Sequence, residues 1–282
     1  MSVDTFIPEV WAARLLENMH KAQVFTQAGI VNRDYEGDIA NAGDTVRIQA
    51  IGAITIGTFT KNTDIAAPET LTDAETTLLI DQAKYFNFQV DDVDRRQMSV
   101  NLIDGAMREA AYGLRNVADQ VVAGLYASAG SAVGSAAAPK TDLATAGQAY
   151  VHLVSLGQAL DEKDTPTDGR WVAVPPWFHS KLLLDDRFVK SGTDSAAGVL
   201  ANGEVGQAAG FRILKSNNVS NDGTTYRIMA GTAAAISYAE QINKVEAFRP
   251  ERRFADAVKG LHLYGVKVLR PTALATLYAN AA

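Results

Sequence analysis

A helical pattern of apolar residues runs without interruption from about residue 93 to residue 128. Its apolar positions are three and four residues apart: Val100, Ile103, Met107, Ala110, Leu114, Val117, Val121 and Leu125. This spacing predicts one amphipathic helix, which at about 1.5 Å per residue would be roughly 50 Å long. Gly105, Gly113 and Gly124 weaken such a helix by about 1 kcal/mol each relative to alanine, so packing against other elements has to hold it.

The stretch before this helix alternates with the period of two that is typical of β-strands. Val46, Ile48, Ile54 and Ile56 are separated by polar or small residues, and a polar strip follows up to about residue 75. We therefore predict a long hairpin followed by an extended strip. A two-stranded hairpin is marginal by itself in water, so this one needs another surface to lie on, in the same subunit or in the next.

The N-terminal stretch predicts a short amphipathic helix. Pro8 suits its first turn because the N–H that proline lacks would be unpaired there. The apolar residues that fall on one face are Trp11, Leu15, Leu16 and Met19. This helix is either part of the core or an arm that docks on a neighbouring molecule.

The second half of the chain mixes helical and strand patterns. The segment "ASAGSAVGSAAAPK", residues 127–140, marks a domain junction because its residues are small and flexible. A helical stripe follows, made of Tyr150, Leu153, Val154, Gly157 and Leu160. "RWVAV" predicts a buried strand, Pro176 begins a short helix, and "FRILK" and "TYRIMAGTAAAISYA" predict further strands. Together with the strand of Phe86, Phe88 and Val90, this order indicates an α+β protein.

Composition excludes several classes of protein. With 282 residues the chain can form one large or two modest domains. A net charge of −6 and a pI near 5.3 argue against a tight nucleic-acid binder, which is normally basic. The absence of cysteine excludes disulfides, thiolate nucleophiles and cysteine-ligated metals. No stretch approaches the ~20 apolar residues that cross a bilayer, so we expect no membrane contact and synthesis in a cytoplasm.

The glycines of "GEVGQAAG", residues 203–210, invite comparison with a phosphate-binding loop. Such a loop has to be followed by a helix whose N-terminus faces the phosphate, whereas "FRILK" predicts a strand. We therefore interpret Gly206 and Gly210 as residues of a turn at a loop-to-strand join. A soluble α/β enzyme that binds a phosphate ligand at 203–210 is the alternative.

Other candidate sites have simpler interpretations. Asp91, Asp92 and Asp94 lack the further ligands of a calcium loop, and they suit the N-terminus of the long helix. The four histidines show no spacing of three or four residues, so a helical metal motif is absent. Arg249 and the run 251–253 form a solvated turn or an intersubunit ion-pair network. We expect no catalytic, cofactor-binding or metal-binding residues.

Taken in order, five segments resemble the major capsid proteins of tailed bacteriophages, and in particular coat proteins of siphophages that infect actinobacteria. They are "FIPEVWAARLLENMHKAQVF", "VNRDYEGDIANAGDTVRI", "IDQAKYFNFQVDDVD", "GFRILKSNN" and "YGVKVLRP". The resemblance covers nearly the whole chain and rests on this succession rather than on a catalytic signature.

The resemblance implies the tailed-phage major capsid fold, which is shared with herpesvirus shell proteins and encapsulins. In this sequence it implies an N-terminal arm at 1–35 and an extended E-loop at 36–75. It implies a peripheral domain at 76–140 and 236–282, with its spine helix at about 93–128, and an axial domain at 141–235. We expect no scaffolding segment before the arm, and Lys61 on the E-loop is a candidate for a cross-link to an asparagine of a neighbour.

The function that the resemblance implies is structural. Copies of the chain would form the hexamers and pentamers of an icosahedral phage head around double-stranded DNA, which the acidic wall would touch only weakly. Scaffolding, portal and decoration proteins are further candidate partners. The expected location is the virion, after assembly in the bacterial cytoplasm. An encapsulin-like compartment shell is the second alternative.

Overall fold

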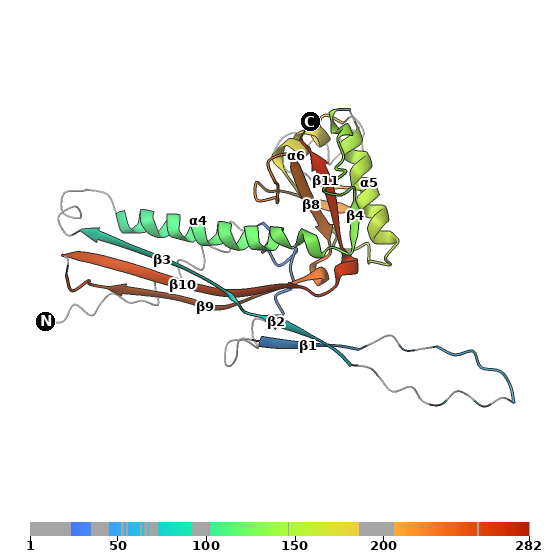
Figure 1. Cartoon of the computed structure of the whole chain (residues 1–282), viewed down its shortest axis with the longest axis horizontal. Helices are drawn as coiled ribbons and strands as arrows, with labels where there is room; N and C mark the ends of the chain where they lie inside the picture. The colour runs from blue at the N-terminus through green and yellow to red at the C-terminus, as the bar shows by residue number, and fades with distance from the viewer. Residues whose placement is uncertain are drawn as a thin grey trace.

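The computed structural model describes residues 24–34, 45–51, 54, 56–62, 64, 67, 73–91, 102–145, 147–185, 206–252 and 254–281. Figure 1 shows three parts: a long layer along the longest axis, an upright layer that stands near one end of it, and a hairpin that extends beyond both. The long layer comprises α4, β3, β9 and β10. The upright layer is a six-stranded sheet with α5 and α6.

In the long layer, one helix packs on an antiparallel sheet. The strand order is β3 (Gln82–Asp91), β10 (Ala255–Val268) and β9 (Ile236–Phe248). Strand β3 alternates as predicted, and its Phe86, Phe88 and Val90 pack against α4 (Leu102–Ala123). These side chains form the cluster that holds the helix on the sheet.

The predicted long helix is present in its described part. Helix α4 continues into the 3-10 turn η1 (Gly124–Ser128), whereas residues 93–101 lie outside the described residues. Met107 and Leu114 are buried as predicted. Ala111, Ala118 and Val122 are also buried, each one position beyond the predicted Ala110, Val117 and Val121, which are half-buried.

The upright layer is a mixed sheet. Its order is β4 (Ser131–Val133), β11 (Leu274–Asn280), β8 (Thr225–Gly231), β5 (Trp171–Val174), β7 (Phe211–Lys215) and β6 (Gln207–Ala208). The pairs β11–β4 and β5–β7 are parallel and the others antiparallel. Helices α5 (Gln148–Asp161) and α6 (Pro176–Leu183) complete the layer, and every residue of β5 is buried.

Two sequence expectations need correction here. The predicted axial domain, 141–235, did not include β4 and β11, which were assigned to the peripheral parts 76–140 and 236–282. In the structure both strands pair in the sheet that contains β5 and β8. Pairing between strands far apart in the sequence leaves no local pattern from which it could be read. In α5, Val154 is exposed rather than buried, because apolar residues occur on more than one side of this helix and Ala149, Leu153 and Leu156 face the core.

Between residues 102 and 281, the described chain crosses from one layer to the other at three 3-10 turns: η1, η3 (Ala233–Ala235) and η4 (Pro271–Ala273). Backbone hydrogen bonds tie the crossings together. The N–H of Gly130 donates to Pro271 over 2.8 Å, and the N–H of Leu269 donates to Ala235 over 2.8 Å. A Cβ at Gly130 would lie 2.6 Å from the Pro271 oxygen, so only glycine allows this approach.

Residues 24–34, called the strap below, run through the junction of the two layers. Phe25, Ile30 and Val31 are buried and belong to the large cluster that also contains core residues of the upright layer. The expectation of an arm at 1–35 that reaches a neighbour is therefore wrong for 24–34, because these apolar side chains are buried within their own subunit. Residues 1–23, with the predicted N-terminal helix, lie outside the described residues.

The hairpin begins as a two-stranded ladder. β1 (Thr45–Ile51) pairs antiparallel with β2 (Asp73–Leu79). The predicted strand is present up to Ile51. Ile54 and Ile56 pair with no strand among the described residues, so the strand prediction is wrong there. At the base, Leu78 and Ile80 pack with Ala239 of β9, and the Lys267 ammonium donates to the Thr77 carbonyl over 2.7 Å.

Replacing Gly265 with alanine is expected to destabilise the subunit by about 1–3 kcal/mol, the usual cost of overpacking. A Cβ at this position would collide with the Leu79 carbonyl oxygen and would lie 3.0 Å from Ile80 Cα, so backbone at the hairpin base has to move. Chemical denaturation measures the free energy of unfolding. Gly113→Ala on α4 is the matched control, because nothing lies within 4 Å of its added methyl group. Equal stability of the two variants would contradict the prediction.

Candidate assembly surfaces

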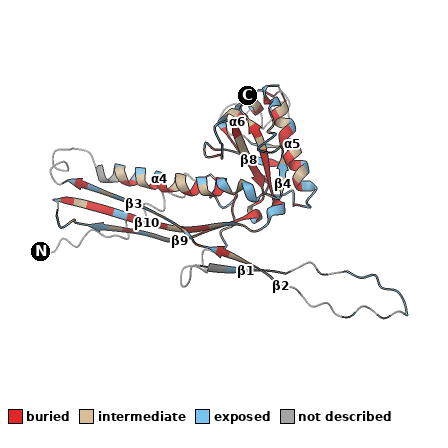
Figure 2. Cartoon of the chain, viewed as in Figure 1, coloured by how far each residue is buried: buried red, intermediate tan, exposed pale blue. Residues whose placement is uncertain are grey.

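The outer part of the hairpin exposes three large apolar side chains. Ile54 is 64% exposed, Ile56 94% and Phe59 74%, and Figure 2 shows this part as exposed wherever it is coloured. Burying a side chain of this size is worth about 1.5–3 kcal/mol. A run of such side chains on a protruding segment indicates contact with another surface.

A groove lies on the face of the long layer's sheet that points away from α4. Its floor and walls are Tyr85, Phe86, Asn87, Lys244, Glu246, Lys259, Gly260 and Leu261. Tyr85 is 76% exposed. The Glu246 carboxylate pairs with the Lys244 ammonium over 2.6 Å and with that of Lys259 over 2.9 Å. The groove thus combines an exposed aromatic ring with two cations and one anion.

The Glu246 carboxylate is expected to stay ionised far into acid. Hydrogen bonds from Lys244, and then from Lys259, lower its pKa from 4.5 to about 2. Because the folded pKa is depressed, the stabilisation by these ion pairs is present above 4.5 and is lost as the pH falls toward about 2. NMR titration of the side-chain carboxyl measures the pKa, with Lys244→Met and Lys259→Met as variants that raise it. A midpoint near 4.5 in the parent would contradict the prediction.

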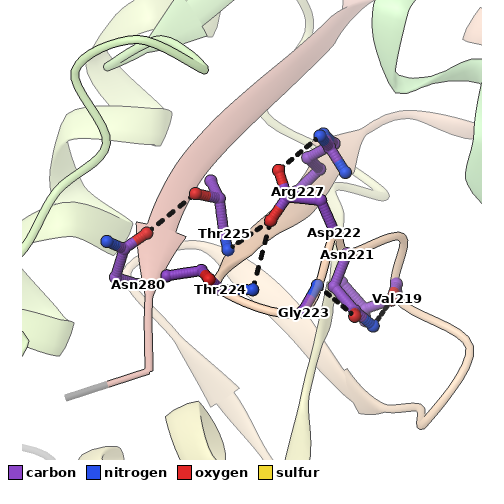
Figure 3. Close-up of polar contacts among 8 residues, drawn as sticks. All are labelled: Val219, Asn221, Asp222, Gly223, Thr224, Thr225, Arg227 and Asn280. Atoms are coloured by element: carbon purple, nitrogen blue, oxygen red, sulfur yellow. Dashed lines mark hydrogen bonds and ion pairs between the residues drawn. The ribbon is translucent and has the colours of Figure 1, made fainter.

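A polar turn closes one end of the upright sheet (Figure 3). Asp222 Oδ1 accepts hydrogen bonds from the N–H groups of Thr224 and Thr225 over 3.1 and 2.8 Å, and Asp222 Oδ2 accepts from Arg227 over 3.0 Å. The Thr225 hydroxyl donates to Asn280 Oδ1 over 2.9 Å. The N–H of Thr225, above all, lowers the pKa of Asp222. These polar groups hold the turn together.

The glycine stretch 203–210 makes a hairpin in its described part. Ala209 and Gly210 have φ of +51° and +80° and connect β6 to β7 in a two-residue turn, as in a type I′ hairpin. The predicted turn role is confirmed for Gly210, whereas residues 203–205 lie outside the described residues. A strand follows the turn, so no helix N-terminus faces it.

Within the described ranges, no group of three His, Cys, Asp or Glu side chains could hold a metal ion. None of the helices in the described part is long and apolar enough to span a membrane.

The comparison with known families decides between the interpretations. A family model described as phage capsid protein matches residues 74–277, well over half of the chain. The chain belongs to this phage capsid family. A structure from Mycobacterium phage Che8 is 31% identical, covers 90% of both chains and superposes with a TM-score of 0.76. The chain matches none of the curated proteins.

More distant structures share the fold of this capsid protein. The capsid of cyanophage P-SCSP1u is 19% identical with a TM-score of 0.71, over 86% of this chain and 85% of that one. A virus-like particle from Pyrococcus furiosus is 14% identical with a TM-score of 0.58, over 95% and 98%. The predicted α+β capsid fold is confirmed, and so is the resemblance to a phage of an actinobacterium.

The remaining described residues that the sequence singled out lie in the hairpin, at the end of β3 and in the turn between β9 and β10. Lys61 is exposed in the outer part of the hairpin. Asp91 ends β3, whereas Asp92 and Asp94 lie outside the described residues, so their capping role stays a prediction. Arg249, Glu251 and Arg252 are exposed in the turn between β9 and β10.

Two polar sites at the junction were not predicted from the sequence. The first is Asp119, which is 3% exposed on α4. The second is the pair of Glu240 and His262, whose Oε1 and Nε2 atoms are 2.6 Å apart. The helical pattern did not predict Asp119, because successive residues of a helix are about 100° apart and Asp119 falls outside the predicted apolar stripe. No sequence pattern predicted the groove, because the register of β3, β10 and β9 brings its residues together.

Proposed function

We propose that this capsid protein is the major shell subunit of a phage head, in which its copies form the hexamers and pentamers of an icosahedral shell around double-stranded DNA. The role is structural, without catalysis. The expected location is the virion, after assembly in the cytoplasm of the host. Scaffolding, portal and decoration proteins complete the proposed set of partners.

The exposed hairpin carries the proposal. Ile54, Ile56 and Phe59 are exposed on a segment that projects away from both layers (Figure 1), whereas the described apolar residues of both layers form buried clusters. A subunit that gains burial for these side chains only from a neighbour is stabilised by assembly. The net charge of −6 supports a wall that confines DNA without gripping it.

Expression of the chain followed by electron microscopy and analytical ultracentrifugation tests the proposal. We expect closed particles with five-fold and six-fold capsomers, either from the chain alone or after addition of a scaffolding protein from the same genome. Particles isolated from lysed host cells should protect DNA from nuclease. A chain that sediments only as a small oligomer under both conditions would overturn the proposal, and particles filled with an enzyme instead of DNA would support the encapsulin-like alternative.

A further inference from the structure

The strap touches both layers of the subunit at the point where they meet. It lies beside the C-terminal part of α4 on one side and beside the start of β9 on the other (Figure 1, blue). Its middle approaches the upright layer, since a Cβ at Gly29 would lie 3.1 Å from Nη1 of Arg212 on β7. The strap therefore contacts the long layer at both ends and approaches the upright layer in its middle, at the junction where the crossings also connect the two layers.

Asp119 holds the first end of the strap. Its Oδ1 atom accepts hydrogen bonds from the backbone N–H groups of Val24, Phe25 and Thr26 over 3.2, 3.0 and 3.4 Å. Its Oδ2 atom accepts one from Asn218 Nδ2 over 3.4 Å. Asn218 follows β7 of the upright layer. One carboxylate thus joins the strap, the long helix and the upright layer.

The second end of the strap is bound to the long layer's sheet. The N–H of Asn32 donates to the Ile236 carbonyl over 2.8 Å, and the N–H of Tyr238 donates to the Asn32 carbonyl over 3.0 Å. The Arg33 guanidinium lies 3.4 Å from the Glu240 carboxylate and 5.0 Å from the centre of the Tyr238 ring. This end therefore has both backbone and ionic contacts.

Asp119 accepts hydrogen bonds from three backbone amides, but burying its carboxylate costs free energy. A buried carboxylate loses its hydration. Burial raises the pKa of Asp119, and the hydrogen bonds from Asn218 and the backbone amides oppose the rise. A neutral amide oxygen could accept the same N–H groups at lower cost. The Asp119 side chain positions the strap, because its two oxygens accept hydrogen bonds from different parts of the subunit.

We propose that the strap is a conformational lock, which fixes the angle between the long layer and the upright layer, and that Asp119 is its positioning residue. The three crossings are short turns, and such segments can absorb a change of angle. A rotation of the upright layer has to break the hydrogen bond between Asp119 and Asn218 or move Arg212 away from Gly29, while the contacts of the strap with α4 and β9 hold it on the long layer. This inference concerns the single subunit and does not depend on shell formation.

Distance measurement between two spin labels tests the lock. The chain has no cysteine, so Glu109→Cys on α4 and Glu162→Cys just after α5 introduce the only thiols, and both positions are exposed. Labelled full-length chains are diluted with unlabelled ones, and double electron–electron resonance gives the distance distribution. Hydrogen exchange reports the amides of residues 24–26 in parallel. The variants are Asp119→Ala, Asp119→Asn and, as the matched control on α4, the exposed position Gln120→Ala.

We expect Asp119→Ala to broaden the distance distribution and to speed exchange of amides 24–26 by about tenfold or more, since three buried N–H groups lose their acceptor. Asp119→Asn keeps the oxygen that accepts from the three amides, and its new NH2 group can donate to the Asn218 oxygen once that amide turns over, so this variant should retain the narrow distribution. Gln120→Ala should match the parent. Faster exchange with an unchanged distribution would overturn the proposal, as would no change in either. If Asp119→Ala does not fold, Phe25→Val, which loosens the same end of the strap, is held to the same outcomes.

Discussion

Replacing Ile56 and Phe59 together with aspartate is expected to leave the subunit folded and to abolish closed shells. Both side chains are largely exposed, so the substitutions remove little burial from the subunit itself, and surface changes of this kind usually alter stability by no more than about 0.5 kcal/mol. In an assembled shell they would place unpaired charges in a contact, at a cost of several kcal/mol per ion. Ultracentrifugation and electron microscopy measure assembly, and thermal unfolding measures the fold.

The matched control for this variant adds the same charge to the same segment. Thr58→Asp with Thr60→Asp changes two exposed polar residues that flank Phe59, so shells should still form. If both double variants lose shells to the same extent, charge on the hairpin rather than loss of apolar contact is responsible. If neither loses shells, the hairpin is not an assembly surface.

Replacing Trp171 with alanine is expected to destabilise the subunit by about 3–5 kcal/mol, the usual cost of deleting a buried aromatic side chain. Trp171 is 1% exposed on β5, between its partner strands β7 and β8. Its indole Nε1 atom has no hydrogen-bond partner among the described residues, and the expected loss comes from packing. The effect is measured by denaturant unfolding of subunits that carry Ile56→Asp and Phe59→Asp, with and without Trp171→Ala, so that assembly does not contribute.

Trp177→Ala is the matched control for this second variant. Trp177 lies in the first turn of α6, which follows β5, and is only half-buried. Its ring contacts Phe178 and Tyr226 edge-on, at 5.7 and 5.4 Å between ring centres. We expect a clearly smaller loss. Equal losses would show that the centre of the upright sheet is not the more tightly packed site.

Elements with a local pattern could be predicted from the sequence. The spacing of Met107 and Leu114 indicated α4, and the alternation of Phe86 and Phe88 indicated β3, because periodicity reports which face of an element is buried. The same reasoning failed at Ile56, where an alternating apolar residue is exposed in the subunit. A pattern states that a side chain needs cover and does not state which molecule supplies it.

Contacts between distant segments could not be predicted. β11 pairs with β4 across more than half of the chain, and Asp119 meets Val24 and Asn218 from opposite sides in sequence. No local propensity encodes such partners. The same difference applies to the candidate surfaces. The exposed hairpin was expected from its composition. The groove and the strap could be found only once the register of the strands and the path of the chain were known.

The place of β11 in the upright sheet limits how this layer can be used on its own. A fragment of residues 141–235 would lack β11 and would leave one hydrogen-bonding edge of β8 open. Open edges recruit strands from other molecules, so such a fragment should aggregate. A display scaffold made from this layer has to carry residues 274–280 grafted beside β8, for example by circular permutation.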